Sequence, residues 1–364
     1  MKQVIGIYCG NLTDYYWDEN TILENGGGGS ETWAVEIARE FQSRGFHVIV
    51  FGNPDCWKFA SSGVEYVPFS MFHHRCEYQH FDYFISSRQI SEIGHFLKCD
   101  NVYIMSHDIC LHYADEAKDL KLDRVKKIAY LSEWHRDILE KWYKDGIPNG
   151  QMFKTINGVD PSIYSKSSEF TKENMMVWSS RSERGLRYFI NWVYPAIKEK
   201  VPDFKLKVCL YLNDFSDECD EGIELFGKLG KNDLAELQMR SKLWVYPNLG
   251  FLDTNGMPFQ ETFCITAVEN GLAENAIVCG DAGGLKTTLE GYSGLIGKDI
   301  YENGYINGHE KMVQYAEKLA DESIKILTDD DYRLKKAAEA KSICSKYTWA
   351  NSVETWLNEW NIKY

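Results

Sequence analysis

The stretch Pro258-Phe-Gln-Glu261-Thr-Phe-Cys-Ile-Thr-Ala-Val-Glu269-Asn-Gly-Leu-Ala places two carboxylates eight residues apart, with mostly apolar side chains between them. An apolar run precedes it, Leu243-Trp-Val-Tyr-Pro-Asn248, and another follows it, Ala276-Ile-Val-Cys-Gly280. Both runs are typical of buried strands. The sequence therefore predicts a loop and a helix between two parallel strands. Such loops open at the carboxyl edge of the sheet, where open α/β proteins bind their ligands.

The spacing of the two glutamates suits one elongated ligand. If Glu261 lies at or before the first helical turn and Glu269 lies two turns in, they are about 80° apart around the axis and about 12 Å apart along it. The N–H groups of the first turn would lie between them and favour an anion such as a diphosphate. A nucleotide-sugar carries hydroxyls at both ends and a diphosphate between them. The alternative is a pair of solvated helix glutamates, which the flanking buried strands disfavour.

The first 52 residues predict a β-α-β unit with glycines at its first turn. The strand Val4–Tyr8 is followed by a loop from Cys9 to Gly29, and the next strand is 47–52. The helix between them ends at about Arg44, with Ser30 expected at its N-cap. The loop is too long for a G-x-G-x-x-G fingerprint, which excludes a bound NAD. The loop also holds aromatic residues at 15–17, which could stack on a sugar or pack within the loop.

The same alternation continues along the chain and predicts an α/β fold with doubly wound parallel sheets. The clearest helix of the first half is 133–144, with apolar residues at helical spacing. A polar stretch, 166–174, is expected to link this half to a second series of β-α units, which includes a long helix from Gly185. The predicted strands of the first half are 65–69, 81–86, 102–107, 127–132 and 154–157, and those of the second half include 175–180 and 207–211.

The E-x7-E stretch, with Tyr246-Pro247 before it and Asp281-Ala-Gly-Gly284 after it, resembles the retaining glycosyltransferases of the GT-B fold, in the large family four (glycosyl transferases group 1). In that family a segment like Asn157-Gly-Val-Asp160 marks the passage between two domains. The resemblance implies two Rossmann-like doubly wound domains that face a cleft. The first, 1–165, would be the acceptor domain, with a C-terminal helix at about 346–364 packing back on it. The second, 166–345, would be the nucleotide-sugar donor domain.

The resemblance also implies roles for individual residues. Glu261 would hold hydroxyls of the donor sugar, Glu269 would hold the ribose, and His107, at the end of a predicted strand, would position the sugar. A histidine satisfied inside the fold is the alternative for His107. The remaining expected donor-binding residues are Thr262, Phe263 and Cys264, and the expected acceptor or phosphate loop is Gly28, Gly29, Ser30 and Glu31.

The segment Ser179-Ser180-Arg181-Ser-Glu-Arg184-Gly185 carries two guanidinium groups between a strand and a helix. A departing nucleoside diphosphate develops negative charge, which an aimed guanidinium stabilises. The family pattern is glycine-arginine followed by lysine-glycine. Here Arg184-Gly185 stands where lysine-glycine is expected, and a serine stands in place of the first arginine. Arg184 is therefore the candidate catalytic cation, with Ser180 as a donor-binding residue, while Arg181 could bind phosphate or be a surface charge.

Composition limits the classes of partner. The 364 residues are 44% hydrophobic and carry a net charge of −14, which disfavours nucleic-acid binding. Ten scattered cysteines with no C-x-x-C pair fit reduced thiols of a cytoplasmic protein. We expect no metal and no cofactor. The expected partners are a UDP- or GDP-sugar donor and a glycan or other hydroxyl acceptor, and peripheral membrane contact is compatible with the family.

Two other classes of function remain open from the sequence. A nucleotide-sugar epimerase or a phosphorylase could share the fold, although no acid–base pair for an epimerase is evident and the chain is short for a phosphorylase with pyridoxal phosphate. A non-catalytic partner subunit is the third hypothesis. The intact pair of Glu261 and Glu269 disfavours this last hypothesis.

Overall fold

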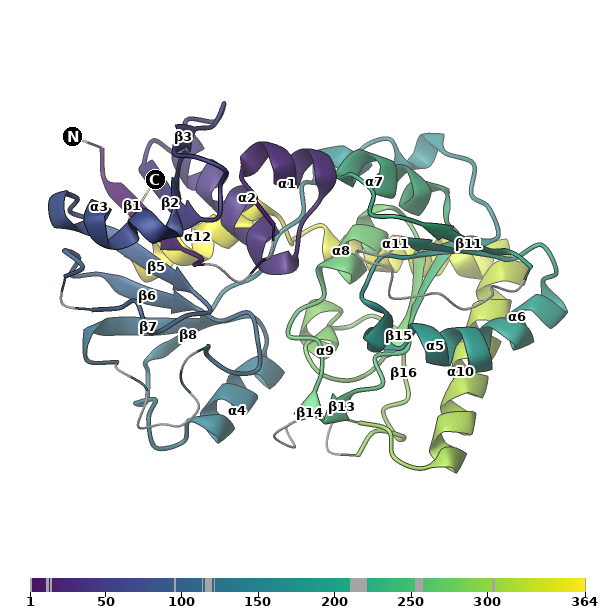
Figure 1. The fold of residues 1–364 in the computed structure, drawn as a ribbon. Coiled ribbons are helices and arrows are strands. Elements are labelled where there is room, and N and C mark those ends of the chain that lie inside the picture. Colours follow the sequence, from purple (N-terminus) through teal and green to yellow (C-terminus); the bar gives the residue numbers. More distant parts are fainter. Residues whose placement is uncertain are drawn as a thin grey trace. The chain divides into compact units, whose positions relative to one another are not determined.

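The structure is a computed structural model that describes residues 2–10, 13, 15–94, 96–112, 114, 120, 122–209, 221–252, 258–302 and 305–363. The chain divides into two compact units. Unit 1 comprises Met1–Gly158 and Trp349–Tyr364, and unit 2 comprises Val159–Thr348. Figure 1 shows the course of the chain through both units. Among the described residues, no helix has the length and the apolar character needed to cross a membrane.

Unit 1 is built on an eight-stranded sheet in the order β3-β4-β2-β1-β5-β6-β7-β8. All neighbours pair in parallel except the short edge strand β3, which is antiparallel to β4. The chain winds outward from β1 in both directions, so this is the doubly wound sheet expected from the sequence. The strands are β1 (Val4–Tyr8), β2 (His47–Gly52), β3 (Lys58–Phe59), β4 (Glu65–Pro68), β5 (Tyr83–Ser87), β6 (Val102–Met105), β7 (Val125–Tyr130) and β8 (Met152–Lys154).

Helices cover both faces of this sheet. On one face, Phe72 of α3 (Phe72–Tyr78) and Leu139 of α4 (Glu133–Trp142) share a buried apolar cluster with Ile49 and Phe51 of β2. The other face is covered by α2 (Gly29–Ser43) and α12 (Trp349–Glu359), which pack against each other. The purple and yellow ribbons of these two helices lie together in Figure 1. The C-terminal helix is thus part of the core of unit 1.

The loop after β1 differs from the expectation in two ways. It contains a short helix, α1 (Glu19–Asn25), which a capping box stabilises because Asp18 and Thr21 bond each other's backbone. The expected N-cap of α2 was wrong as well, because Gly28 is the N-cap and no side chain caps the helix there. The helix begins at Gly29, two residues earlier than a Ser30 N-cap would place it.

Unit 2 has two three-stranded parallel sheets, β11-β10-β9 and β12-β15-β16. They meet where β9 and β12 begin, since the N–H of Glu173 donates to the Arg240 carbonyl (2.8 Å). The two strands separate toward their carboxyl ends, where the rings of Trp178 and Tyr246 lie 5.6 Å apart. The strands are β9 (Met175–Trp178), β10 (Lys205–Cys209), β11 (Ile223–Phe226), β12 (Leu243–Tyr246), β15 (Ala276–Gly280) and β16 (Leu295–Ile296), with the hairpin β13 (Phe251–Leu252) and β14 (Pro258–Phe259).

The long helix expected from Gly185 is interrupted. A 3-10 turn, Ser182–Arg184, precedes α5 (Leu186–Tyr188), and a π-helical turn, Phe189–Val193, separates α5 from α6 (Tyr194–Lys200). Pro195 is the second residue of α6, and its missing N–H removes one α-helical hydrogen bond there. The other helices of unit 2 are α7 (Lys231–Arg240), α8 (Ile265–Leu272), α9 (Leu285–Thr288), α10 (His309–Thr328) and α11 (Asp330–Cys344).

The stretch expected to link two domains is packed on unit 2. Ser167 is buried, and its hydroxyl donates to the carbonyl of Ala273 (2.6 Å) at the end of α8. The ammonium group of Lys172 donates to the same carbonyl (2.5 Å) and to the Asn275 side chain (2.9 Å). A helix end leaves carbonyl groups without partners, and a cation there satisfies them. The polar composition of 166–174 therefore serves helix capping.

Trp356 ties α12 to unit 1, and its loss should be costly. The side chain is fully buried and contacts Trp33, Tyr103 and Phe153. We predict that Trp356→Ala lowers the free energy of unfolding of unit 1 by about 3–5 kcal/mol, because a large cavity is left in the core. Urea denaturation followed by circular dichroism measures this change. Glu354 lies on the same helix as Trp356, and Glu354→Ala removes a surface ion pair with Arg44 of the α2 C-cap, so it should cost less than about 1 kcal/mol. Equal losses in the two variants would contradict the prediction.

Candidate functional site

Glu261 lies in the segment between β14 and α8, and two side chains hold its carboxylate near the carboxyl end of β12. The hydroxyl of Tyr246, the last residue of β12, donates a hydrogen bond to Glu261 Oε1 (2.5 Å). The guanidinium of Arg184 approaches the same oxygen at 3.7 Å. Two of the expected catalytic residues, Glu261 and Arg184, are thus neighbours in unit 2. Tyr246 ends β12, whereas Arg184 lies in the segment that follows β9.

The backbone around Glu261 is fixed as firmly as its side chain. The N–H of Gly284, in the loop after β15, donates to the Glu261 carbonyl (2.6 Å). A side chain at Gly284 would collide with the backbone of Thr262, so glycine is required for this close approach. The paired glycines after β15, which could have formed an ordinary loop or a ligand site, therefore brace the Glu261 segment.

The helix that carries Glu269 begins at a strained residue. Cys264 is the N-cap of α8 and has a left-handed backbone conformation with φ of 74°. A residue other than glycine seldom adopts this conformation and does so at an energetic cost. Its thiol is buried, and burial together with the Glu261 carboxylate raises the pKa of the thiol. Cys264 is therefore an unreactive thiol whose position turns the chain from the Glu261 loop into α8.

Glu269 has neutral hydrogen-bonding neighbours. Gln238 of α7 donates to Glu269 Oε2 (3.4 Å), and its amide oxygen accepts a hydrogen bond from the Tyr164 hydroxyl (2.7 Å). Burial raises the pKa of Glu269, while the Gln238 hydrogen bond and the charge of Lys231 oppose that shift. A partly buried carboxylate gains much from a ligand that offers hydroxyl donors.

The other expected donor-binding residues occupy different settings. Arg181 extends into solvent with a side chain that is 74% exposed, 3.7 Å from Glu183, whereas the Arg184 side chain is only 24% exposed. The Ser180 carbonyl accepts a hydrogen bond from the Trp178 indole (2.6 Å). Phe263 is buried against Tyr347, with ring centroids 5.1 Å apart, so it anchors the segment.

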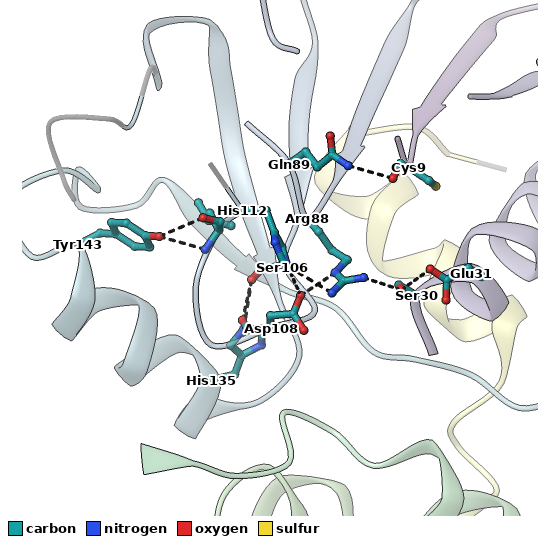
Figure 2. A network of polar contacts seen from close by, with 11 residues as sticks. Cys9, Ser30, Glu31, Arg88, Gln89, Ser106, Asp108, His112, His135 and Tyr143 are labelled. Atoms are coloured by element: carbon teal, nitrogen blue, oxygen red, sulfur yellow. Dashed lines mark hydrogen bonds and ion pairs between the residues drawn. The ribbon is translucent and has the colours of Figure 1, made fainter. Parts of the chain in front are cut away.

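Unit 1 gathers a second polar cluster at the carboxyl ends of β5 and β6 (Figure 2). Arg88 donates to Asp108 Oδ2 (2.6 Å) and to the Ser30 hydroxyl (3.2 Å), and His112 Nε2 lies 2.9 Å from the same Asp108 oxygen. Burial alone would raise the pKa of Asp108, but the His112 hydrogen bond and the Arg88 charge hold that pKa well below its usual value. Asp108 is therefore ionised.

The expected acceptor or phosphate loop ends in this cluster. Ser30 donates to Glu31 Oε1 (3.0 Å), and the Glu31 carboxylate lies against Gly28, where a side chain would collide with it. Gly28 is the N-cap of α2 and Gly29 its first residue, and the carboxylate of Glu31 lies at this start of the helix. An acidic group suits the positive end of a helix. A second anion such as phosphate would be repelled at this position, whereas a hydroxyl would find an acceptor.

Two histidines of unit 1 are neutral. Burial lowers the pKa of His107, the expected sugar-positioning residue, to about 3, and its ring lies edge-on to Trp33 with centroids 5.0 Å apart. Burial also lowers the pKa of His135 to about 4. His135 Nδ1 accepts from the Leu131 N–H (3.2 Å), so Nε2 carries the proton that bonds the Asp108 carbonyl (2.8 Å).

The sequence analysis did not find four residues that shape these sites. They are Arg88, His112, His135 and Gln238. Arg88 follows a strand, which was a usable signal, but its left-handed backbone with φ of 69° was not readable from the sequence. Within the described residues, no group of three or more His, Cys, Asp or Glu side chains could hold a metal ion.

Comparison with known proteins identifies the fold. The sequence matches no family model and no curated protein. Among solved structures, a glycosyltransferase involved in avilamycin A biosynthesis, AviGT4, is 13% identical with a TM-score of 0.68, covering 99% of this chain and 97% of its own. Sucrose-phosphate synthase from Thermosynechococcus elongatus is 12% identical with a TM-score of 0.66 and 99% coverage of both chains.

A third similar structure was solved with a nucleotide-sugar. Anabaena Alr3699/HepE in complex with UDP-glucose is 13% identical with a TM-score of 0.65, covering 99% of this chain and all of its own. The chain therefore has the GT-B fold of these glycosyltransferases. The fold class that the sequence predicted is confirmed.

The raised pKa of Glu269 predicts a pH-dependent gain in stability for Glu269→Gln. The folded-state pKa lies above the unfolded one, so the carboxyl stabilises the fold at low pH and loses that contribution as the pH rises. The amide keeps an oxygen for Gln238 and carries no charge. We expect the variant to melt a few degrees higher than the wild type at pH 8 and at the same temperature near pH 4. Thermal denaturation across this range tests it, with the exposed Glu199→Gln as the control. A less stable variant at pH 8 would refute the assignment.

Proposed function

We propose that this protein is a retaining glycosyltransferase that moves a sugar from a nucleotide-diphosphate sugar to an acceptor hydroxyl, most simply on a glycan. The observation that carries the proposal is the convergence of Glu261, Arg184 and Tyr246 at the carboxyl end of β12, in a chain with the GT-B fold. A carboxylate for sugar hydroxyls and a cation for the leaving diphosphate then stand next to each other.

In the proposed reaction, the bond from the anomeric carbon to the diphosphate oxygen breaks and a bond to the acceptor oxygen forms on the same face. The acceptor proton passes to the departing diphosphate, which balances the charge. Glu261 accepts hydrogen bonds from donor-sugar hydroxyls, and Glu269 accepts them from the ribose. Arg184 stabilises the leaving diphosphate through charge-assisted hydrogen bonds, with Ser180 and Thr262 beside it, and Arg181 at most an outer contact.

Unit 1 would bind the acceptor in this proposal. Glu31 and the ionised Asp108 offer oxygen acceptors, and Ser30 and the neutral His107 lie in the same region. Because the Glu31 carboxylate already occupies the start of α2, we assign Gly28, Gly29, Ser30 and Glu31 to acceptor hydroxyls and not to the donor phosphates. UDP-glucose is the first donor to test, because Anabaena Alr3699/HepE was solved in complex with it.

A donor screen tests the proposal. Thermal melting of the protein with UDP-glucose, GDP-mannose and ADP-glucose should show one donor that raises the melting temperature by about 5 °C, since a ligand at 100 times its Kd stabilises by about 2.7 kcal/mol. Glu261→Gln should lower transfer from that donor on the order of 100-fold or more. Glu199→Gln, an exposed glutamate of the same unit, should leave transfer unchanged. Wild-type turnover in Glu261→Gln would refute the assignment of Glu261.

We also propose that transfer needs no metal ion or other cofactor, because Arg184 supplies the positive charge at the leaving group. Turnover should then be the same in excess EDTA as with added Mg²⁺ or Mn²⁺, measured as release of the nucleoside diphosphate. A metal-dependent rate that EDTA abolishes would overturn this part of the proposal. Arg184→Gln should be slowed on the order of 100-fold under both conditions.

A further inference from the structure

The hydroxyl of Tyr246 contacts Glu261, although only the aromatic ring of Tyr246 is needed for packing. Its side chain is fully buried at the end of β12. The ring stacks on Trp244 with centroids 5.0 Å apart and an interplanar angle of 9°. It also lies 5.6 Å from the ring of Trp178 on β9. A phenylalanine would make these ring contacts equally well, so packing does not explain the hydroxyl.

The ring contacts turn the hydroxyl into a rigid donor. Two tryptophans on two strands fix the plane of the ring, and the hydroxyl then has one direction, toward Glu261 Oε1 at 2.5 Å. Burial and the neighbouring Glu261 carboxylate raise the pKa of Tyr246, so the phenol keeps its proton at every working pH. The hydrogen bond therefore runs always from the tyrosine to the carboxylate.

Both side-chain contacts of Glu261 converge on the same oxygen. Tyr246 and Arg184 both approach Oε1, while the Gly284 N–H holds the Glu261 carbonyl. A carboxylate that is held at one oxygen and at its own backbone cannot rotate freely. Its second oxygen, Oε2, then has a defined direction in which to meet a ligand hydroxyl.

We propose that Tyr246 is a positioning residue, whose hydroxyl keeps the Glu261 carboxylate aimed at the sugar of the donor without touching the sugar itself. This inference rests on the proposed function. It separates two parts of donor binding: the sugar depends on Tyr246 through Glu261, and the nucleoside diphosphate does not. Removal of the hydroxyl should therefore affect a nucleotide-sugar and leave the nucleotide alone unaffected.

The test is Tyr246→Phe in the full chain, with binding measured by calorimetry. The probes are UDP, GDP and ADP and the corresponding UDP-glucose, GDP-mannose and ADP-glucose. We expect the variant to bind the nucleoside diphosphate with the wild-type Kd and to bind the matching nucleotide-sugar about 10-fold more weakly. The kcat of transfer should fall by about 10- to 100-fold, because a displaced positioning group disturbs the geometry of the reacting atoms. Equal weakening of both probes would overturn the proposal, because it would show a general disturbance of the unit.

Tyr292 offers a matched control in the same unit. It is also a buried tyrosine, and its hydroxyl exchanges hydrogen bonds with the backbone of Ile277 (2.8 Å each). Tyr292→Phe should lower the melting temperature without changing the ratio of the two Kd values. An equal change in the ratio of the two Kd values in Tyr246→Phe and Tyr292→Phe would overturn the inference. Failure of the wild type to bind any of the six probes would instead refute the proposed function, and the inference with it.

Discussion

The parallel pairing of β12 with β15 is the constraint on which the site in unit 2 depends. Tyr246 pairs with Cys279 at the end of this ladder, so the chain leaves both strands at the same edge. The Glu261 segment follows one strand and Gly284 follows the other, which lets the Gly284 N–H reach the Glu261 carbonyl. An antiparallel pair would send the two loops to opposite edges. The separation of β9 from β12 at the same edge then places the Trp178 and Tyr246 rings where the sheet is no longer hydrogen-bonded.

The partly buried carboxylates of the two units are compensated to different degrees, and this difference separates structural groups from groups that could bind ligands. Asp108 has a guanidinium at 2.6 Å and a histidine nitrogen at 2.9 Å, and its pKa is held low. Glu269 accepts a hydrogen bond from an amide at 3.4 Å, and burial raises its pKa. Glu261 stands between these two cases, with a phenol at 2.5 Å and a guanidinium at 3.7 Å. A carboxylate that the protein leaves partly uncompensated gains the most when a ligand donates hydrogen bonds to it.

Much of the fold could be predicted from the sequence because apolar runs and helical spacing are local properties. The strands around Glu261 and the helix at 133–144 lie within a few residues of their predicted places. The N-cap of α2 was not predictable in this way, because Ser30 is recruited by Arg88, a residue 58 positions away in the sequence. The role of Tyr246 was hidden for the same reason. The sequence singled out Tyr246 as part of the Tyr246-Pro247 pair. The direction of its hydroxyl, however, depends on the tryptophan rings of two strands.

Backbone strain marks both candidate sites, but for different reasons. At Arg88, with φ of 69°, the backbone is held by the Met105 carbonyl and the His112 N–H (2.8 Å each), and the guanidinium joins Asp108 to Ser30. A glycine would relieve the strain there and lose the whole network, so the strain at Arg88 serves its side chain. At Cys264 the thiol is buried, and burial raises its pKa. The strain at Cys264 therefore serves the turn of the chain, which must leave the extended Glu261 segment and enter α8 within one residue so that Glu269 follows on the helix.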